Sequence, residues 1–470
     1  MKTNPAFCIF SGTLPQVVAV LCGTLVAMSD GMNYGWTSPV IPILLSEKSP
    51  IKTTMHECEW LENILNVGAF AGLPVTIYLV DKIGRKKCLL LAAFVSLLCW
   101  ILVAIANRME YLYVTRFMGG MAGDMAFVAG PMYIGEIADQ KIRGFLSSMI
   151  YLMMLCGIII IYSVAPYVPF YVPSIIAGTL LVLELILFPF MPESPYYLIF
   201  TGKTEEAKKA LLHFRPNKDV EAELQDITAA IKRQKSEKGR PQDLILIDSN
   251  RKALLIMTVL NGAQHFSSIS VIIMNLHLIL ESAGSIYMES SLAAIIFAVI
   301  MFCAATVSSF SMDKFGRKIL LSTSTILSGV CLLVIAVYFN FKDYGVDVKF
   351  ISWIPIVSVM FYACAFKLGL GLVPIVLTAE LFPAKMKAIG MTLADAMYVV
   401  FSLISIYFYQ WLSDSYGIFV PFYLFSASCF ITTIFTLLFI PETKGKTLEE
   451  IQFILKGIKE PVKGKRDSVL

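Results

Sequence analysis

The stretch Asp81-Lys82-Ile83-Gly84-Arg85-Lys86 recurs almost unchanged as Asp313-Lys314-Phe315-Gly316-Arg317-Lys318. Two other landmarks repeat in the same order. Glu136 with Arg143 is echoed by Glu380 with Lys387, and Pro192-Glu193-Ser194 is echoed by Pro441-Glu442-Thr443. Three landmarks that recur in one order indicate a chain built from two similar halves in parallel orientation.

The sequence around these landmarks is too apolar for a water-soluble domain. Of the 470 residues, 57% are hydrophobic and only 15% are charged, with a mean hydropathy of +0.73. A bilayer core needs about 20 mostly apolar residues per helix. Twelve such runs begin near Val17, Leu61, Leu89, Tyr111, Phe145, Tyr171, Ala253, Ser290, Ile319, Ile351, Ala388 and Val420. We therefore expect an all-α membrane protein with twelve transmembrane helices in two six-helix bundles.

The repeats divide the chain into four parts. We expect an N-terminal bundle over residues 1–191, a cytoplasmic loop over 192–252, a C-terminal bundle over 253–441 and a cytoplasmic tail over 442–470. In the loop, Thr204 is a candidate helix cap, and an apolar stripe predicts a second short amphipathic helix. The stripe comprises Leu224, Ile227 and Ile231. The first apolar run contains Asp30 and Asn33 without a cleavage pattern after it, so we interpret it as a retained helix and not as a signal peptide.

The basic residues predict the orientation, because Lys and Arg near short loops stay on the cytoplasmic side. Most of the 38 Lys and Arg residues fall in the N-terminus, the C-terminal tail and the loops after even-numbered runs. The opposite loops hold only Lys48, Lys52, Arg108, Lys342 and Lys349. Both termini are therefore expected in the cytoplasm, and the net charge of +4 is explained by topology without a nucleic-acid partner. We expect a multi-pass protein of the plasma membrane, with an internal membrane as the alternative.

Carboxylates stand beside basic residues at the helix ends expected to face the cytoplasm. Arg85, Glu136 and Arg143 are expected to cluster in the first half; Arg317, Glu380 and Lys387 are expected to do so in the second. Such pairs suit a gate, because they hold while partly desolvated and are solvated separately when water enters. Basic anchoring to the membrane surface is the alternative, but it does not explain the glutamates.

These motifs, with Arg116 in the fourth run, resemble the signature of the sugar porters of the major facilitator superfamily over nearly the whole chain. Trp36-Thr37-Ser38-Pro39, Pro383-Ala384-Lys385 and the stretch Gly445-Lys446-Thr447-Leu448-Glu449-Glu450-Ile451 resemble the insect facilitated trehalose transporters. The expected gating charges are Asp81, Arg85, Glu136, Arg143, Glu193, Asp313, Arg317, Glu380, Lys387 and Glu442. For all of these except Asp81, Asp313 and Lys387, the resemblance implies a role in stabilising the outward-facing state. It also implies that Arg116 lies in the core of the first half.

Polar residues in two runs predict a substrate cavity. The seventh run carries Asn261, Gln264, His265, Ser268 and Asn275 at spacings that keep them on one face of a continuous helix. The first run adds Asp30, Asn33 and Thr37, which are expected to face the same cavity because lipid exposure is costly. Packing between helices is the alternative for each of them. The expected substrate contacts are Gln264, His265, Asn33 and Phe366, of which Phe366 matches a pocket aromatic of the family.

The cavity departs from the family at several positions. The usual Gln-Gln-X-X-Gly-X-Asn of helix seven reads Gln264 to Ser270 here and keeps only the first Gln. Tyr151 replaces a Gln, Met301 an Asn, Leu372-Val373-Pro374-Ile375 a Pro-X-Pro-Trp run, and Tyr398-Val399 an Asn-Trp pair. Each lost hydrogen-bond partner is worth about 1 kcal/mol, so binding of an ordinary hexose is expected to be weakened.

Three core charges, Asp30, Arg116 and Lys367, raise the question of ion coupling. Lys367 lies near the middle of a run, so we expect it to pair with Asp30 or Asp395, or else to contact an anionic substrate. Asn33 stands where proton-coupled relatives carry an Asp, which favours facilitated diffusion. Asp30, one turn earlier, is the alternative proton site.

The leading hypothesis is a facilitative carrier for a sugar, trehalose or a monosaccharide, that works by alternating access. A proton-coupled sugar symporter, a carrier of a different polar solute and a non-transporting membrane sensor are the alternatives. We expect no enzyme, because no nucleophile–base constellation stands out. The ten cysteines show neither zinc nor redox spacing, so no metal or cofactor is expected. The expected partners are the small-molecule substrate and the lipid bilayer, with a monomer sufficient for function.

Overall fold

The computed structural model describes residues 13–456 except 48, 50, 140–141, 217–219, 237–241, 384–385, 445 and 447. The regular structure of these residues is helical throughout. The side chains of Asp313 and Lys387, two of the expected gating charges, lie outside the described part.

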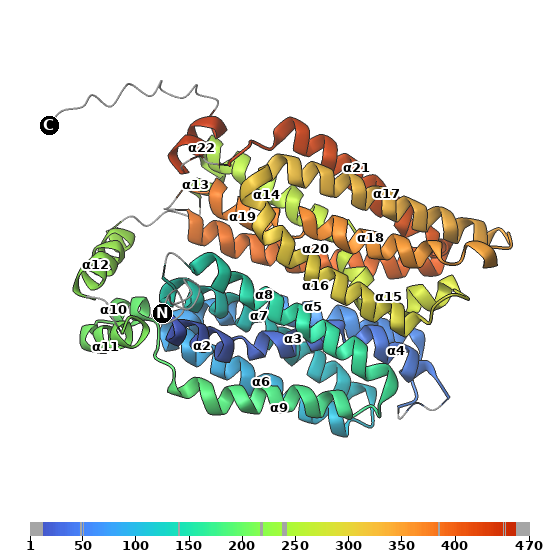
Figure 1. Cartoon of the computed structure of the whole chain (residues 1–470), viewed down its shortest axis with the longest axis horizontal. Coiled ribbons are helices and arrows are strands. Elements are labelled where there is room, and N and C mark those ends of the chain that lie inside the picture. Colours follow the sequence, from blue (N-terminus) through green and yellow to red (C-terminus); the bar gives the residue numbers. More distant parts are fainter. Residues whose placement is uncertain are drawn as a thin grey trace, which may run out of the picture.

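The first half contains six membrane-crossing segments (Figure 1, blue to green). The first crossing is made of three consecutive helices, α2 (Leu14–Gly23), α3 (Leu25–Gly35) and α4 (Thr37–Leu45). The others are α5 (Met55–Ile83), α6 (Arg85–Ile105), α7 (Met109–Ile137), α8 (Arg143–Val164) and α9 (Val172–Leu187). Two 3₁₀ turns, η1 (Ala165–Tyr167) and η2 (Phe188–Phe190), follow α8 and α9.

The second half repeats this arrangement (Figure 1, yellow to red). Its first crossing consists of α14 (Asp248–His265) and α15 (Ile269–Ala283), and its fourth of α18 (Ile354–Leu368) and α19 (Val373–Leu381). The remaining crossings are α16 (Ser290–Phe315), α17 (Arg317–Asp343), α20 (Lys387–Tyr416) and α21 (Phe419–Phe439). A 3₁₀ turn, η3 (Lys349–Ile351), precedes α18.

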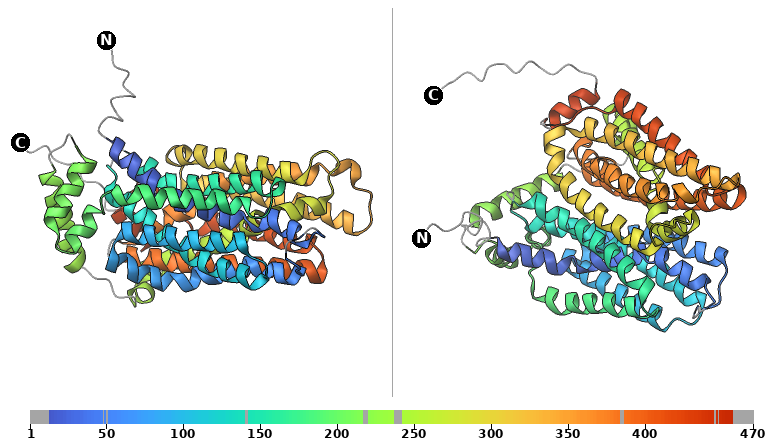
Figure 2. Two further views of the ribbon diagram at one scale, coloured as in Figure 1. Left: turned by 90° about the horizontal axis from the view of Figure 1, so that it is seen from below. Right: turned by 45° about the vertical axis from the view of Figure 1, so that its right-hand side comes forward.

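Four short helices connect the halves: α10 (Pro195–Phe200), α11 (Thr204–Phe214), α12 (Glu221–Ser236) and α13 (Asp243–Leu246); a further one, α22 (Leu448–Leu455), follows the second half. Figure 2 shows α10–α12 gathered at one end of the molecule, which we call the terminal end because α2 begins and α22 ends there; the opposite end is the distal end. Leu224 packs against Leu198 and Leu211, as the apolar stripe predicts. Thr204 is not the cap of α11, because it is the first helical residue and Lys203 precedes it without a side-chain cap.

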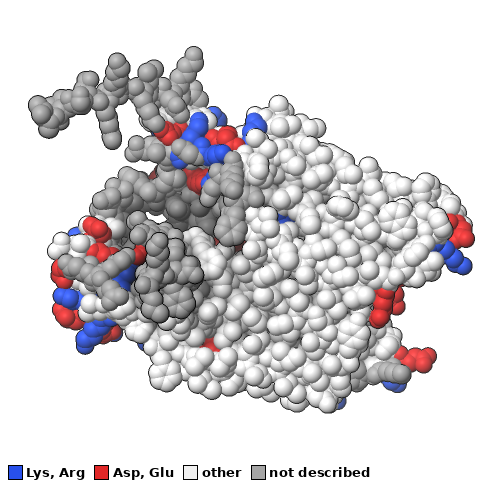
Figure 3. Space-filling model, viewed as in Figure 1, with Lys and Arg blue, Asp and Glu red and all other residues white. Residues whose placement is uncertain are grey.

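Eleven of the described segments are long and apolar enough to cross a membrane. The twelfth, α7, has 29 residues, but Glu110, Arg116, Asp124 and Glu136 interrupt its apolar character. In Figure 3 the charged residues gather at the two ends of the molecule, with a broad band almost free of charge between them. The expectation of twelve transmembrane helices in two six-helix bundles is confirmed.

Glycines let α3 and α8 pack with their backbones in contact. A Cβ on Gly31 would lie 1.9 Å from the carbonyl oxygen of Met154, and a Cβ on Gly157 would lie 2.0 Å from that of Met28. Close backbone approach at small residues is the usual means of tight packing in membranes, where no hydrophobic effect drives helices together. This contact positions the polar residues of α3 beside α8.

The two halves meet mainly along α8 with α16, α5 with α20 and α4 with α15, and α3 also contacts α15. The right view of Figure 2 shows the halves side by side, with α8 and α16 in adjacent positions at their boundary. The candidate substrate contacts and core charges therefore lie either at the interface between the halves or inside one half.

Candidate functional site

Two crossings of the second half are interrupted at mid-membrane. The break between α14 and α15 contains Ser268, whose φ of 77° is the one positive value among the described non-glycine residues. The break between α18 and α19 spans Gly369 to Leu372. Gln264 Nε2 donates to the carbonyl of Leu370 at 2.9 Å, and the Tyr362 hydroxyl donates to the carbonyl of Ser267 at 2.6 Å. Side chains thus satisfy backbone groups that the breaks set free, as the apolar surroundings require.

A cavity of about 20 Å³ lies beside these breaks, between the two halves. Its lining comprises Tyr34, Tyr151, Met154, Leu155, Ile158, Gln264, Ile269, Ile273, Met301, Phe366, Lys367 and Tyr398. A water molecule needs roughly 10–15 Å³ of such space, so this cavity holds about one. A sugar fits only if the lining moves apart.

Lys367 is buried in this lining, with an exposed fraction of 2%. Its Nζ donates to the Tyr151 hydroxyl at 3.0 Å and lies 4.5 Å from the centre of the Tyr151 ring. Among the described residues it makes no ion pair, so neither Asp30 nor Asp395 is its partner. The expected pairing with one of these aspartates is therefore wrong.

The four expected substrate contacts do not converge on one cavity. Gln264 and Phe366 line the central cavity, whereas His265 is packed next to it: its Nδ1 lies 2.8 Å from the Ser270 hydroxyl and its ring 4.2 Å from the Tyr398 ring. Asn33 lines a different pocket, inside the first half. The break at Ser268 also separates Asn275 from the others, because α15 starts a new helical register after it. The single polar face expected for this run does not form.

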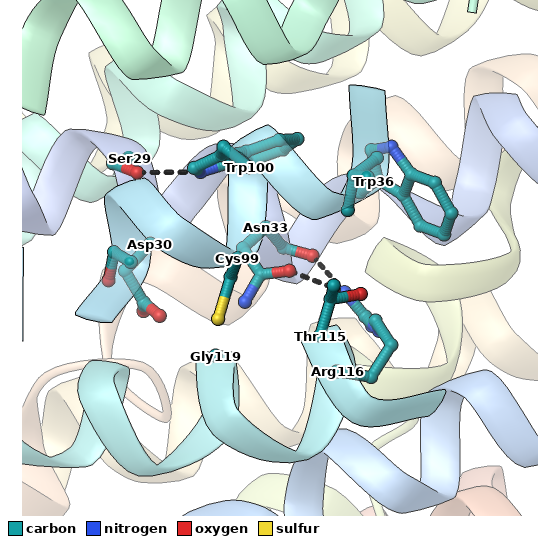
Figure 4. A pocket seen from close by; sticks show the side chains of 11 residues that line it. Ser29, Asp30, Asn33, Trp36, Cys99, Trp100, Thr115, Arg116 and Gly119 are labelled. Atoms are coloured by element: carbon teal, nitrogen blue, oxygen red, sulfur yellow. Dashed lines mark hydrogen bonds between the residues drawn. The ribbon is translucent and has the colours of Figure 1, made fainter. Parts of the chain in front are cut away.

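Arg116 of α7 organises the pocket that contains Asn33 (Figure 4). It is 1% exposed, and its Nη1 donates to the Oδ1 of Asn33 at 2.9 Å and to the backbone carbonyl of the same residue at 2.5 Å. Its Nε donates to the carbonyl of Leu61 at 3.0 Å. Asp30 lines the same pocket, but it makes no ion pair among the described residues. Arg116 thus ties α3 and α5 to α7 through neutral acceptors.

Polar contacts close the interface between the halves toward the distal end. The carboxylate Oε2 of Glu62, a fully buried residue of α5, accepts from Asn275 Nδ2 at 3.0 Å and from Gln410 Nε2 at 3.1 Å. Asn63 Nδ2 donates to Gln410 Oε1 at 2.7 Å. Nearby, the Ser38 hydroxyl lies 2.8 Å from His277 Nδ1. These contacts all join the first half to α15 or α20 of the second.

At the terminal end, one cluster of charges holds the first half together. Arg85 contacts Glu136 Oε1 through Nη2 at 3.1 Å and through Nε at 3.2 Å, and its Nη1 lies 3.8 Å from Asp81 Oδ1. Glu193 accepts from the backbone N–H of Lys86 at 3.0 Å, near the start of α6. Carboxylates are stabilised at helix N-termini because unpaired N–H groups point outward there.

The second half repeats this cluster with equivalent residues. Arg317 Nη2 contacts Glu380 Oε1 at 3.0 Å, and Glu442 accepts from the backbone N–H groups of Arg317 at 3.0 Å and Lys318 at 3.1 Å. Burial raises the pKa of Glu442, but the backbone N–H groups of Arg317, Lys444 and Lys318 lower it, and the balance leaves the pKa below its usual value. The motifs that repeat in the sequence therefore make equivalent ion pairs and helix-capping hydrogen bonds in the two halves.

Among the contacts of the described residues, each cluster joins helices of one half. The expected pairing of Arg143 with Glu136 is not formed, because Arg143 Nη2 instead donates to the carbonyl of Ala138 at 3.3 Å. Glu136 accepts from Arg85 and from the Ser194 hydroxyl, so both of its oxygens are occupied.

Several residues of the distal contacts were missed in the sequence. Glu62 and Asn63 are neighbours in the second apolar run, and Gln410 is in the eleventh. A carboxylate and amides within an apolar run are a signal in themselves, since such groups are placed in a membrane only where they find partners.

The comparison with known proteins agrees with this architecture. The family described as "Sugar (and other) transporter" matches residues 15–455. A facilitated trehalose transporter of Culex quinquefasciatus is 28% identical over 445 residues, which are 94% of this chain and 86% of that protein. One of Polypedilum vanderplanki is 29% identical over 460 residues, or 97% of this chain and 90% of that protein. The chain covers about half the length of others, such as 52% of one from Drosophila mojavensis.

Solved structures share the fold. The inward-open xylose transporter XylE from E. coli superposes with a TM-score of 0.75 at 21% identity, over 93% of this chain and 98% of that one. XylE, a proton:xylose symporter of the major facilitator superfamily, bound to 6-bromo-6-deoxy-D-glucose gives a TM-score of 0.72. Because the family match spans nearly the whole chain, this protein belongs to the sugar (and other) transporter family.

Proposed function

We propose that this protein is a facilitative carrier that moves a sugar, trehalose or a monosaccharide, across the plasma membrane by alternating access. Its family supports the transport role, and the trehalose transporters among its relatives support the substrate class. The observation that carries the proposal is the central cavity, because both halves contribute to its lining. Cavities between repeated bundles are the substrate sites of carriers that rock one bundle against the other.

The moving units proposed are residues 1–191 and 253–441, joined by the loop 192–252 and followed by the tail 442–470. We place the terminal end in the cytoplasm and the distal end outside. A monomer contains both bundles and is therefore sufficient for the transport cycle. The hydrogen bonds of Glu62 and Gln410 across the distal interface support an inward-facing assignment for this conformation.

Seven of the gating charges are proposed to stabilise the outward-facing state, in which the terminal ends of the bundles approach each other. They are Arg85, Glu136, Arg143, Glu193, Arg317, Glu380 and Glu442. Their geometry supports a part of this role, because Glu193 and Glu442 fix the starts of α6 and α17 within their own halves. Each bundle therefore moves as a rigid body with its charged end preformed.

Facilitated diffusion is favoured over proton coupling by the partner of Arg116. That partner is the amide of Asn33, which does not titrate. Asp30 lies in the same pocket without an ion pair to a described residue, so it is our candidate proton site if transport is coupled.

Uptake by the purified protein in proteoliposomes tests the proposal. Radiolabelled trehalose, glucose, fructose, polyols and organic acids are offered with and without an imposed proton gradient, and protein-free liposomes serve as the control. We expect saturable uptake that ends when the solute concentrations inside and outside are equal and whose rate does not depend on the proton gradient. Accumulation above equilibrium that Asp30→Asn abolishes would instead establish a symporter, and absence of uptake for every solute would favour the sensor.

A further inference from the structure

The central cavity contains one charged lining residue, the ammonium of Lys367. This cation is 2% exposed and makes no ion pair with the described part of the chain. A buried charge in a membrane protein normally pairs with an opposite charge, coordinates a ligand or faces a water-filled path. Lys367 therefore lies at the cavity wall without a compensating anion among the described side chains.

Neutral groups keep the ammonium in place. Tyr151 supplies a hydroxyl acceptor at 3.0 Å, and the ring centres of Tyr151 and Phe366 lie 4.5 and 5.4 Å from Nζ. Lys367 is also in the last turn of α18, where the helix dipole favours a cation. These partners stabilise the positive charge without cancelling it, so a net positive charge remains at the cavity wall.

The rest of the lining offers few partners to a polyhydroxyl solute. Seven of the lining residues are apolar, namely Met154, Leu155, Ile158, Ile269, Ile273, Met301 and Phe366. The Nε2 of Gln264 is already used by Leu370, whereas its buried Oε1 has no partner. The Tyr34 hydroxyl donates to Ser270. One ionic contact on an otherwise largely apolar surface suits a solute with a single anionic group and a less polar body.

We propose that the transported solute carries a carboxylate, which Lys367 Nζ binds in the central cavity while the remainder of the solute lies against the apolar wall. The inference rests on the carrier function proposed above and replaces the neutral sugar in it with a small organic acid, sugar acids included. A neutral sugar leaves the ammonium without a counter-charge, whereas a carboxylate forms a charge-assisted hydrogen bond with it.

Two matched pairs of solutes isolate the charge. Glucuronate and glucose differ at one carbon, and they are compared by uptake into proteoliposomes. Phenylacetate and phenylacetamide are compared by thermal unfolding of the full-length protein in detergent, where permeation plays no part. The variants are Lys367→Met, which removes the charge, Lys367→Arg, which keeps it, and the control Lys203→Met, which removes an exposed charge from the loop.

We expect the wild type to take up glucuronate at least tenfold faster than glucose and to be stabilised by phenylacetate but not by phenylacetamide. In Lys367→Met, glucuronate uptake should fall at least tenfold and phenylacetate should no longer raise the melting temperature, whereas glucose uptake should be retained. Lys367→Arg should retain both effects, and Lys203→Met should match the wild type. Faster glucose than glucuronate uptake in the wild type, or an unchanged preference in Lys367→Met, overturns the proposal.

Failure of the two proposals looks different. Saturable glucose uptake without glucuronate uptake leaves the sugar carrier standing and refutes the carboxylate site. A phenylacetate-specific thermal shift that Lys367→Met abolishes, in a protein that transports nothing, supports the site and refutes the carrier. If Lys367→Met does not fold, the wild type and Lys367→Arg decide the matter: both must prefer the charged member of each pair.

Discussion

At the scale of single residues, the break in the seventh crossing shows how this chain departs from its family. Ser268 occupies the position where sugar porters usually have the Gly of the Gln-Gln-X-X-Gly-X-Asn motif, and its φ is 77°. A side chain in the left-handed region costs of the order of 1 kcal/mol unless local contacts compensate. Its buried hydroxyl has no partner in the described part of the chain, so compensation is lacking.

Ser268→Gly is therefore expected to raise the free energy of unfolding by about 1 kcal/mol, because glycine adopts this backbone conformation without strain. Thermal unfolding of the purified protein measures the effect. The neighbouring Ser267→Gly serves as the control and should destabilise by about 1 kcal/mol, since the Ser267 hydroxyl donates to the carbonyl of Gln264 at 2.6 Å. Destabilisation by Ser268→Gly would contradict the strain argument.

The same residue explains why part of the candidate site could not be predicted. The spacing from Asn261 to Asn275 implies one polar face only if the helix is continuous, and periodicity carries no information about a break that serine makes in place of glycine. Gln264 precedes the break and reaches the cavity, whereas Asn275 follows it and contacts Glu62. The sequence also did not show that Lys367 makes no ion pair with a described carboxylate, because contacts in space do not follow from positions in the sequence.

At the scale of elements, helix starts at the terminal end depend on carboxylates from distant segments. Glu442 caps the start of α17 from beyond α21, as Glu193 caps α6 from beyond α9. The repeat of Pro-Glu-Ser and Pro-Glu-Thr landmarks was visible in the sequence. Their role as helix caps was not, because the residues they cap lie more than a hundred positions away.

Glu442→Gln should lower the melting temperature at neutral pH, because the amide is a weaker acceptor for backbone N–H groups and lacks the charge that suits a helix start. The pKa of Glu442 is held below its usual 4.5, so its stabilising effect is present above that value and is lost as the pH falls through the folded-state pKa. Melting curves of both proteins measured from pH 7 downward should therefore converge below about pH 4.5. The exposed Glu206→Gln in α11 should show no such convergence.

The close packing of α3 against α8 leads to a second prediction at the scale of elements. Gly157→Ala places a methyl group 2.0 Å from the carbonyl oxygen of Met28, so the helices must separate, and we expect a loss of about 1–3 kcal/mol in stability. Gly135→Ala in α7 is the matched control, because nothing lies within 4 Å of the added Cβ. In Gly135→Ala the higher helix propensity of alanine should therefore stabilise the protein by up to about 1 kcal/mol. Equal effects of the two variants in thermal unfolding would show that the close approach is unimportant.

At the scale of the whole molecule, the two ends of the bundles are held in different ways. The terminal end has repeated charged clusters that act within each half, and these repeats are what made the two-bundle fold predictable from the sequence. The distal end has contacts between the halves, made by Glu62, Asn63, Asn275 and Gln410, without a repeated counterpart in the sequence. Duplication therefore predicts how each bundle is built but not how the bundles meet.

Gln410 makes three of the hydrogen bonds that join the halves near the distal end. It accepts from Asn63 at 2.7 Å and donates to Glu62 Oε2 at 3.1 Å and to the carbonyl of Glu59 at 3.3 Å. Each hydrogen bond is worth about 1 kcal/mol net, so Gln410→Leu should shift the equilibrium toward a conformation with an open distal end by a factor of roughly ten or more.

Spin labels at Ser46 and Ser282, exposed residues near the distal end on opposite halves, report that shift as a distance. Introduced as unnatural amino acids, they leave the native cysteines unchanged. We expect a longer-distance population in Gln410→Leu than in the wild type. The control Asn340→Leu removes a hydrogen bond to Tyr423 within the second half and should leave the distribution unaltered. An unaltered distribution in Gln410→Leu as well would mean that the hydrogen bonds of Gln410 do not keep the distal end closed.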